Sequence, residues 1–292
     1  MLMALECLPC FLRQALYAAR LSTPAADLRQ KIVREVARLL PDLDMTSTPP
    51  ENSMLVYETI ARLSGCPDPF LDLKKTSNQR ALDLLPRLKE ILAAAADPLW
   101  AAIRLAMAGN VIDYGAHHDF DLNQALGDCL AREPAINHYG LLQKDLRTAR
   151  TVLYLGDNCG ELVFDGLVLE RLKQEVTLAV KERPIINDAL REDALTCGLD
   201  RLAKVMDNGT ACPGTPVPLC SPEFQQAFAA ADLIISKGQG NFETLSETRA
   251  PLYFLLMVKC QVVADHIAAL TGMPARAVTT GDLVLLRTPH WR

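Results

Sequence analysis

Side chains with oxygen donors follow two apolar runs in the second half of the chain. Asp157 and Asn158 stand side by side in the segment GDNCGE, and Asp188 ends the segment KERPIIND. A small set of hard oxygen donors suits an octahedral divalent ion that keeps several waters and shares its other positions with a substrate phosphate. These residues therefore predict a metal site for phosphoryl transfer or phosphate-ester hydrolysis. The alternative is a helix N-cap, in which Glu161 closes a capping box with Asn158.

A third polar segment, SKGQGNFE, combines a lysine with two glycines. Gly238 and Gly240 have no side chains, so the backbone can approach a ligand closely at this point. Lys237 adds a positive charge that would hold the anionic group polarised by the metal. We expect Gly238 and Asn241 to contact the substrate together with Lys237. A plain glycine-rich turn is the alternative.

One helix of the first half carries apolar residues that give way to polar ones. Leu99, Ile103, Ala106, Asn110 and Asp113 follow one another at spacings of three and four, which places them on one helix face. The face therefore leads from a core into a polar site that Asn110 and Asp113 would help to form. The alternative is a helix end that frays into solvent.

The elements that must position these residues differ between the two halves of the chain. From about residue 149 onward, short apolar runs alternate with amphipathic segments of helical length, which predicts an α/β domain around a mostly parallel sheet of about six strands. Ligands of such sheets bind where the carboxyl ends of the strands meet the following loops. The expected strands cover residues 151–155, 176–180, 202–206, 233–236, 253–258 and 283–286.

Two further expectations concern segments near these strand ends. The proline-rich segment 208–222 is expected to form a long loop that borders the site. Asp193, five residues after Asp188, is expected on the surface of the helix that follows.

Residues 1 to about 148 show apolar side chains at helical spacing and almost no β-branched alternation. We therefore expect five or six helices there, and a division into a helical domain (1–148) and an α/β domain (149–292). The predicted helix boundaries are N-caps at Thr23 and Asp97, each followed by a proline, and ends at Gly65 and Gly109.

Composition and charge exclude several classes of protein. The 292 residues are 50% apolar and 22% charged, which is not the composition of a disordered chain. A formal net charge of −5 gives no electrostatic footprint for nucleic acid or for an anionic membrane. We find no apolar run long enough to span a bilayer and no secretion signal at the start of the sequence. Nine cysteines at irregular spacings favour free thiols and a cytoplasmic location.

Two of the cysteines form a CxxC pair near the start of the chain. Cys7 and Cys10 lie at a predicted helix start, where the helix dipole lowers the pKa of a thiol. The pair is interpreted either as structural thiols or as a redox or metal-binding motif. Cys159, inside GDNCGE, would report on the metal site or be oxidised there.

Four segments together resemble the metal-dependent damage-control phosphatases, a family also catalogued as domain of unknown function 89. They are GDNCGE, KERPIIND, SKGQGNFE and GNVID. The resemblance covers almost the whole chain, and the N-terminal CxxC is similar to that of the prokaryotic branch. It implies an α/β fold in which an all-helical N-terminal domain packs on a C-terminal three-layer α/β domain, with the metal at the carboxyl end of the sheet.

The resemblance also implies roles for individual residues. Asp157, Asn158 and Asp188 match the metal ligands of the family, and Lys237 matches its phosphate-contacting lysine. Asn110 and Asp113 would reach the same pocket from the helical domain, and Glu161 would be an acid near the substrate. Family members use Mn, Co, Ni or Mg to hydrolyse phosphate monoesters of sugars and related damaged or surplus metabolites, so a small phosphorylated metabolite is the expected partner.

Two rival functions compete with this hypothesis, and the sequence leaves open whether the chain forms a homo-oligomer. An S-adenosylmethionine-dependent methyltransferase would have a similar strand, turn and helix, but residues 157–159 fill that turn with side chains where the cofactor needs glycines. A non-catalytic sensor of phosphorylated metabolites could bind phosphate with the glycines and Lys237 alone. Metal-dependent hydrolysis of p-nitrophenyl phosphate would distinguish an enzyme from a sensor.

Overall fold

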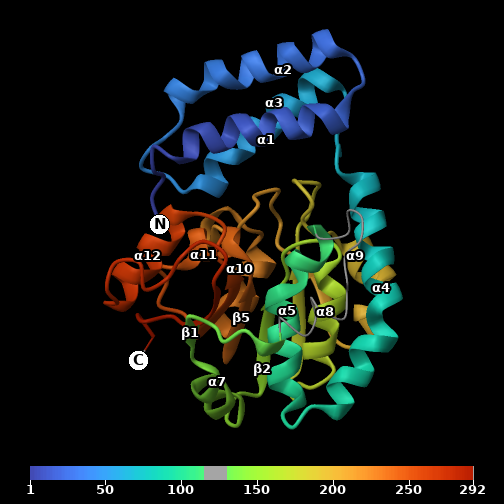
Figure 1. Cartoon of the computed structure of the whole chain (residues 1–292), viewed down its shortest axis with the longest axis vertical. Coiled ribbons are helices and arrows are strands. Elements are labelled where there is room, and N and C mark those ends of the chain that lie inside the picture. Colours follow the sequence, from blue (N-terminus) through green and yellow to red (C-terminus); the bar gives the residue numbers. More distant parts are fainter. Residues whose placement is uncertain (115–129, 292) are drawn as a thin grey trace.

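The structure is a computed structural model that describes residues 1–114 and 130–291, with the side chains of residue 108 and of residues 110–114 outside the description. Three helices form an N-terminal helical unit that lies over one end of the α/β part (Figure 1). Their apolar faces enclose a small core of their own, which also receives Ile185 from the α/β part. The elements of this unit are α1 (Cys7–Ser22), α2 (Ala26–Leu39), the 3-10 turn η1 (Leu40–Asp42) and α3 (Pro49–Ser64).

Two of the predicted boundaries in the helical half are confirmed and two are wrong. α3 ends at Gly65, which has a φ of 68°, and the Asp97 side chain accepts the N–H of Trp100 at 3.0 Å where α5 begins. The predicted N-cap at Thr23 does not form, because its side chain accepts the N–H of Ala25 within the connection between α1 and α2. Gly109 does not end its helix. Gly109 lies inside α5 (Pro98–Tyr114), the helix that follows α4 (Leu71–Ala94).

The position of Gly109 has a packing explanation. A Cβ atom there would lie 3.3 Å from the Glu161 side chain and 3.4 Å from that of Phe164, so the glycine allows α5 to lie close to helix α8 (Glu161–Leu169). The absent side chain therefore serves helix contact rather than helix termination.

The sheet has seven strands in the order β1-β7-β6-β5-β2-β3-β4, and every neighbouring pair is parallel except β6 and β7. The predicted mostly parallel α/β sheet is confirmed, and each of the six expected strands lies within two residues of its predicted bounds. The missed strand, β1, has two residues, too few to show alternation. The strands are β1 (Ile136–Asn137), β2 (Thr151–Leu155), β3 (Glu175–Val180), β4 (Lys204–Asp207), β5 (Leu233–Lys237), β6 (Leu252–Met257) and β7 (Leu283–Arg287).

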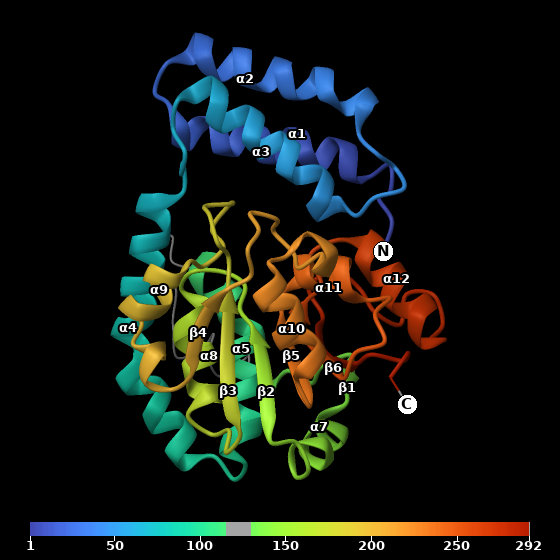
Figure 2. The ribbon, with the colours of Figure 1, turned by 180° about the vertical axis from the view of Figure 1, so that it is seen from behind.

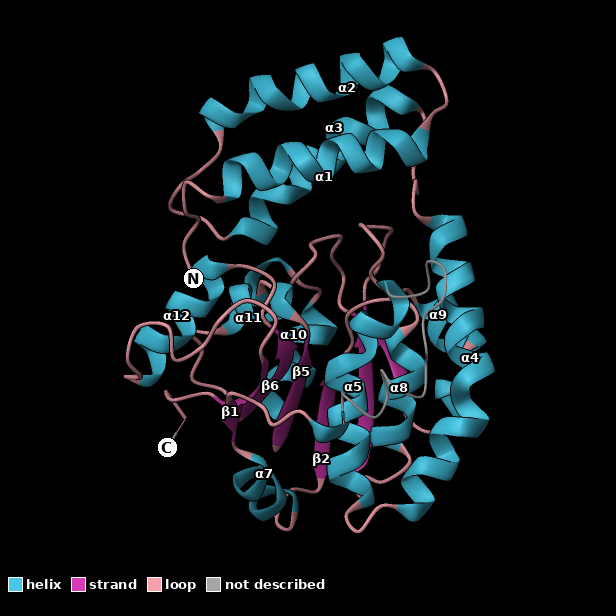
Figure 3. Ribbon diagram, viewed as in Figure 1, coloured by secondary structure: helices cyan, strands magenta, loops and turns pink. Residues whose placement is uncertain are grey.

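Helices cover both faces of this sheet, which explains why its central strands are apolar on both sides (Figures 2 and 3). Val152 and Tyr154 of β2 face a core shared with α4, α5 and α8, whereas Leu153 and Leu155 face a core shared with α10, α11 and α12. The remaining elements are α7 (Tyr139–Leu146), α8 (Glu161–Leu169), α9 (Arg191–Thr196), η2 (Leu199–Arg201), η3 (Val217–Leu219), α10 (Pro222–Ala230), α11 (Gln239–Leu245) and α12 (Gln261–Thr271). Among the described residues, no helix combines the length and the apolar character that crossing a membrane requires.

Candidate active site

A cleft of about 470 Å³ lies between the N-terminal helical unit and the carboxyl ends of the strands. Asp157, Asn158 and Asp188 line one side of it, and side chains of α1 and α3, among them Gln14 and Tyr57, line the other. Pro213, within the loop predicted to border the site, is part of the wall. The polar segments after the strands therefore meet in one place, as expected for a parallel α/β sheet.

The turns after β2 and β3 are hydrogen-bonded to each other. Asn158 and Asp188 face one another in an isolated antiparallel bridge, and the N–H of Ala189 donates to the Asp157 carbonyl at 2.8 Å. Within the second turn Ile186 has a φ of 45°, an unfavourable conformation for a β-branched residue. Strain of this kind persists where the surrounding structure enforces it, and it accumulates at functional sites.

Gly238 leaves room for the Asp157 carboxylate. A Cβ atom at position 238 would lie 2.0 Å from Asp157 Oδ2, and the residue has a φ of 79°. Gly240 is equally constrained, because its Cβ atom would lie 1.8 Å from the carbonyl oxygen of Pro213. Both glycines therefore allow one loop to approach another, and Gly238 fixes where the carboxylate of Asp157 can lie.

The side chain of Asn158 lies between two acids and caps no helix. Its Nδ2 donates to Asp157 Oδ2 and to Glu161 Oε1, both at 2.8 Å. The capping-box alternative is wrong, because α8 starts after Gly160, whose N–H donates to the Asn78 side chain at 2.7 Å. The side-chain oxygen of Asn158 is therefore not used to cap α8.

Three buried acids of this site lie close together. Burial, with the nearby charges of Glu161 and Asp188, raises the pKa of Asp157 to about 8. Burial also raises the pKa of Asp188 to about 6, although the charge of Lys181 opposes the rise. Asp188 Oδ2 is buried, lies 3.7 Å from Lys181 Nζ, and accepts no hydrogen bond from the described residues. A cation in this position would satisfy that oxygen and stabilise the ionised acids.

Lys237 is buried, only 1% exposed, and is held by two carboxylates. Its Nζ lies 3.0 Å from Glu161 Oε2 and 2.7 Å from Asp165 Oδ1, and Tyr154 donates to the same Asp165 oxygen at 2.7 Å. Burial alone would lower the pKa of Lys237, but the charges of Asp165 and Glu161 outweigh it and raise the pKa. The ammonium group therefore orders the acids beneath the cleft.

Lys259 is the lysine that lines the cleft within the described part of the chain. It follows β6 by two residues, its side chain is exposed, and its N–H donates to Gln239 Oε1 at 2.8 Å. Its charge lowers the pKa of Asp157 and of Asp188 against the dominant effect of burial. Lys259 was not predicted from the sequence to be a site residue, although its place directly after the expected strand 253–258 was a usable signal.

Two more polar residues connect the loops around the site. Asn241 donates to the carbonyls of Gly156 and Lys237 at 3.2 and 2.8 Å and accepts from Thr215 at 2.7 Å. Asp193 is buried rather than on a helix surface, because it accepts from the Asn78 side chain at 2.8 Å and caps the start of α9. No pattern in the sequence predicts this contact between Asn78 of α4 and Asp193.

The side chains of Asn110 and Asp113 lie outside the described residues, so their predicted approach to the pocket stays a prediction. The α5 backbone does reach the site, since Gly109 is in contact with Glu161. Among the described residues, no group of three or more His, Cys, Asp or Glu side chains is arranged to hold a metal ion. The proposed ligand set differs from such groups because it consists of two carboxylates and one amide.

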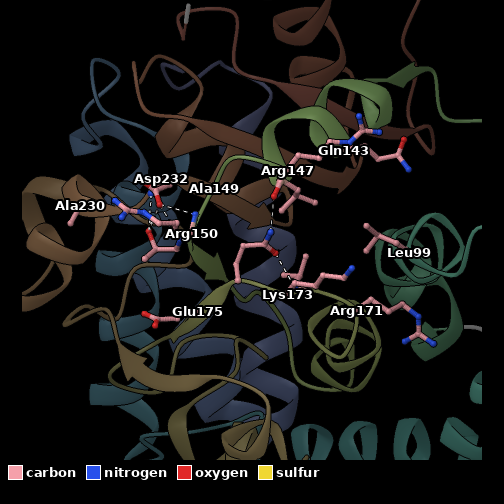
Figure 4. Close-up of a pocket in the computed structure, with 14 residues that line it drawn as sticks. Leu99, Gln143, Arg147, Ala149, Arg150, Arg171, Lys173, Glu175, Ala230 and Asp232 are labelled. Carbon is pink, nitrogen blue, oxygen red and sulfur yellow. Dashed lines mark hydrogen bonds between the residues drawn. The ribbon is translucent and has the colours of Figure 1, made fainter.

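A larger hollow of about 990 Å³ lies at the opposite end of the sheet (Figure 4). Two of its polar side chains are engaged in the fold: Asp232 accepts the N–H groups of Arg150 and Thr151 at 2.9 and 3.0 Å, and Gln174 donates to the carbonyl of Leu146 at 2.7 Å. Arg147, Arg171 and Lys173 also line it. None of the predicted site residues with described side chains lies there, so the cleft lined by Asp157, Asn158 and Asp188 is the candidate active site.

The fold and the cleft define a parallel α/β protein whose acidic strand-end site is covered by helices. Residues 3–273 match the model of the damage-control phosphatase ARMT1-like domain, and the chain belongs to this family. A damage-control phosphatase from Pyrococcus horikoshii is 35% identical over 274 residues, covering 91% of this chain and 94% of that protein. A damage-control phosphatase from Archaeoglobus fulgidus is 33% identical over 285 residues, covering 93% and 98%.

A solved structure supports the same assignment. The crystal structure of a DUF89 family protein from Pyrococcus horikoshii superimposes with a TM-score of 0.89 at 34% identity, covering 99% of both chains. The resemblance recognised in the sequence motifs is therefore confirmed, together with the fold class, and the relatives support a phosphatase.

Proposed function

We propose that this chain hydrolyses phosphate monoesters of small metabolites, such as sugar phosphates and related damaged or surplus compounds, with the help of one divalent cation. Asp157, Asn158 and Asp188 would hold Mn, Co, Ni or Mg. The observation that carries the proposal is the bridge between Asn158 and Asp188, next to the hydrogen bond from the Ala189 N–H to the Asp157 carbonyl. This arrangement leaves a buried Asp188 oxygen without a hydrogen bond from the described residues.

The donor set fits such an ion chemically. Two carboxylates and one amide are hard oxygen donors, and the two negative charges of the carboxylates balance the two positive charges of a divalent cation. Asn158 Nδ2 donates hydrogen bonds to Asp157 and Glu161, and these bonds orient the amide so that its oxygen could serve as the metal ligand. When bound, the ion would polarise the phosphoryl group and lower the pKa of a bound water.

The lysines have separate roles in this proposal. Lys259 is exposed in the cleft and would attract and orient the phosphate group, whose negative charge it complements. Lys237 is buried against Glu161 and Asp165 and would hold the Glu161 carboxylate in place, so that Asn158 keeps its orientation. In this account, the buried lysine positions ligands and the exposed lysine contacts substrate.

The surroundings of the site support a small substrate. A cleft of about 470 Å³ lies within the usual range for metabolite sites. Gln14 and Tyr57 of the N-terminal helical unit face the acids across it and would contact the alcohol part of the ester. We further propose a cytoplasmic enzyme that binds neither nucleic acid nor membranes, and sedimentation analysis would test for a homo-oligomer.

The test is hydrolysis of p-nitrophenyl phosphate and of a panel of phosphorylated metabolites by chelator-treated protein, with Mg, Mn, Co and Ni added in turn. We expect activity that depends on the added ion and is lost in Asp157→Asn. Asp200→Asn changes an exposed acid and is the matched control. Absence of activity with every ion would refute the phosphatase, and tight binding of S-adenosylmethionine would favour the methyltransferase instead.

A further inference from the structure

Three thiols from distant parts of the sequence line the cleft. Cys7 begins α1, Cys10 lies one turn further along, and Cys260 directly precedes α12. The start of the chain is fixed next to α11, because the Met1 ammonium donates to the Glu243 carbonyl at 2.6 Å and to Ser246 Oγ at 3.3 Å. This contact brings the CxxC pair to the same wall as the thiol of the α/β part.

Two of these three cleft thiols are harder to ionise than a free cysteine, because they are partly buried. Burial raises the pKa of Cys7, opposite to the lowering expected at a helix start, and the charges of Glu243, Cys260 and Cys10 add to the rise. Burial likewise raises the pKa of Cys260, with contributions from Glu243 and Cys10. All three side chains are half-buried and therefore accessible from the cleft.

Neighbouring amides orient two of the sulfurs. Gln14 Nε2 donates to Cys10 Sγ at 3.3 Å, and Gln239 Nε2 lies 3.8 Å from Cys260 Sγ. Gln239 also accepts the N–H of Lys259, so the third thiol is joined to the lysine of the cleft through one side chain. Cys260 is therefore connected through Gln239 to the backbone of Lys259.

We propose that these thiols form an oxidation-sensitive site, in which a peroxide joins Cys7 to Cys260 by a disulfide that fastens α1 to the start of α12. The Cys7 thiolate attacks one peroxide oxygen, which breaks the O–O bond, releases one water after protonation and leaves a sulfenic acid. The Cys260 thiolate then attacks that sulfur and displaces its hydroxyl group as a second water. The two sulfurs together lose two electrons, which the peroxide accepts.

The third thiol reverses the bond by exchange. A Cys10 thiolate that attacks the Cys7 sulfur forms the Cys7–Cys10 disulfide and releases Cys260 as its thiolate. An external thiol then reduces the CxxC pair. The crosslink would hold the N-terminal helical unit against the α/β part and narrow the cleft between them, which hinders the entry of substrate.

The experiment uses the full-length reduced protein treated with hydrogen peroxide. Free thiols are blocked, the protein is digested without reductant, and mass spectrometry identifies the joined peptides. We expect a Cys7–Cys260 peptide in the wild type, absent from Cys7→Ser and from Cys260→Ser and retained in Cys66→Ser. Cys66 is also half-buried but does not line the cleft, so it is the matched control.

A second readout separates this inference from the proposed function. The crosslink should raise the melting temperature of the oxidised wild type but not of Cys260→Ser, independently of any activity. The expected loss of most phosphatase activity on oxidation, restored by dithiothreitol, rests on the proposed function. Cys10→Ser cannot exchange and should therefore retain the Cys7–Cys260 peptide. Three thiols that stay reduced under peroxide, or the absence of a Cys7–Cys260 peptide from Cys10→Ser, would overturn the inference even if the phosphatase is confirmed.

Discussion

Replacement of Gly238 by alanine tests how the site is built. The new Cβ atom would lie 2.0 Å from Asp157 Oδ2, whereas such contacts essentially never fall below 3.0 Å, so the carboxylate must move by about 1 Å or more. The residue also has a φ of 79° and a ψ of 165°, a conformation that only glycine adopts readily. Holding alanine there costs about 1–3 kcal/mol of folding stability.

The two effects have different readouts. We expect Gly238→Ala to lower the free energy of unfolding by about 2–4 kcal/mol, measured by urea denaturation of the metal-free protein. Displacement of a ligand by about 1 Å should lower metal-dependent phosphatase activity roughly 100-fold. Isothermal titration with Mn should show a matching loss of affinity.

Gly198→Ala is the matched control. Gly198 has a φ of 73°, but a Cβ atom there meets nothing within 4 Å. The control should lose about 1 kcal/mol of stability and keep full metal affinity and activity. Normal metal binding by Gly238→Ala would refute the reasoning, because the carboxylate of Asp157 could then not be a ligand in the position described.

Three further predictions concern the charged groups. Burial raises the pKa of Asp157 from 3.8 to about 8, so the metal-free fold should lose up to ~1.4 kcal/mol of stability per pH unit as the pH rises between these values. Asp157→Asn should flatten this dependence of unfolding free energy on pH in urea titrations. An unchanged slope in the variant would contradict the raised pKa of Asp157. Lys259→Ala should raise KM about 10-fold and leave stability unchanged within ~0.5 kcal/mol, whereas the exposed control Lys204→Ala should leave both KM and stability unchanged. An unchanged KM in Lys259→Ala would exclude the phosphate contact. Lys237→Met should cost about 3–5 kcal/mol by denaturation, since it leaves two buried carboxylates without their cation, and adding Asp165→Asn should recover part of it; a neutral Lys237→Met would argue against the buried ion pair.

The fold was largely predictable from the sequence because buried parallel strands leave a direct pattern. β2 was predicted with its observed bounds, since an apolar run of five residues that ends at a glycine favours a buried parallel strand over a helix. β1 has two residues and gains its place by pairing with β7, a contact 148 residues distant that no local pattern records. Gly109 was misjudged for the same reason, because its close contact with Glu161 depends on tertiary packing.

The site was predictable only in part. Asp157 and Asp188 stand out as polar residues after apolar strands, and the structure brings them together. Residue type alone did not distinguish the lysines: Lys237 directly ends β5 and is buried, whereas Lys259 lies two residues beyond β6 and faces the cleft. Which lysine meets solvent depends on the helices that cover each strand end.

Metal titration of chelator-treated protein, followed in parallel by calorimetry and by hydrolysis of p-nitrophenyl phosphate, tests the central claim most directly. We predict that activity rises with the bound ion and saturates at about one ion per chain, as a single site of three oxygen ligands requires. Asp157→Asn should neither bind the ion tightly nor hydrolyse the ester. Full activity in the presence of excess chelator, or undiminished activity of Asp157→Asn, would contradict the account.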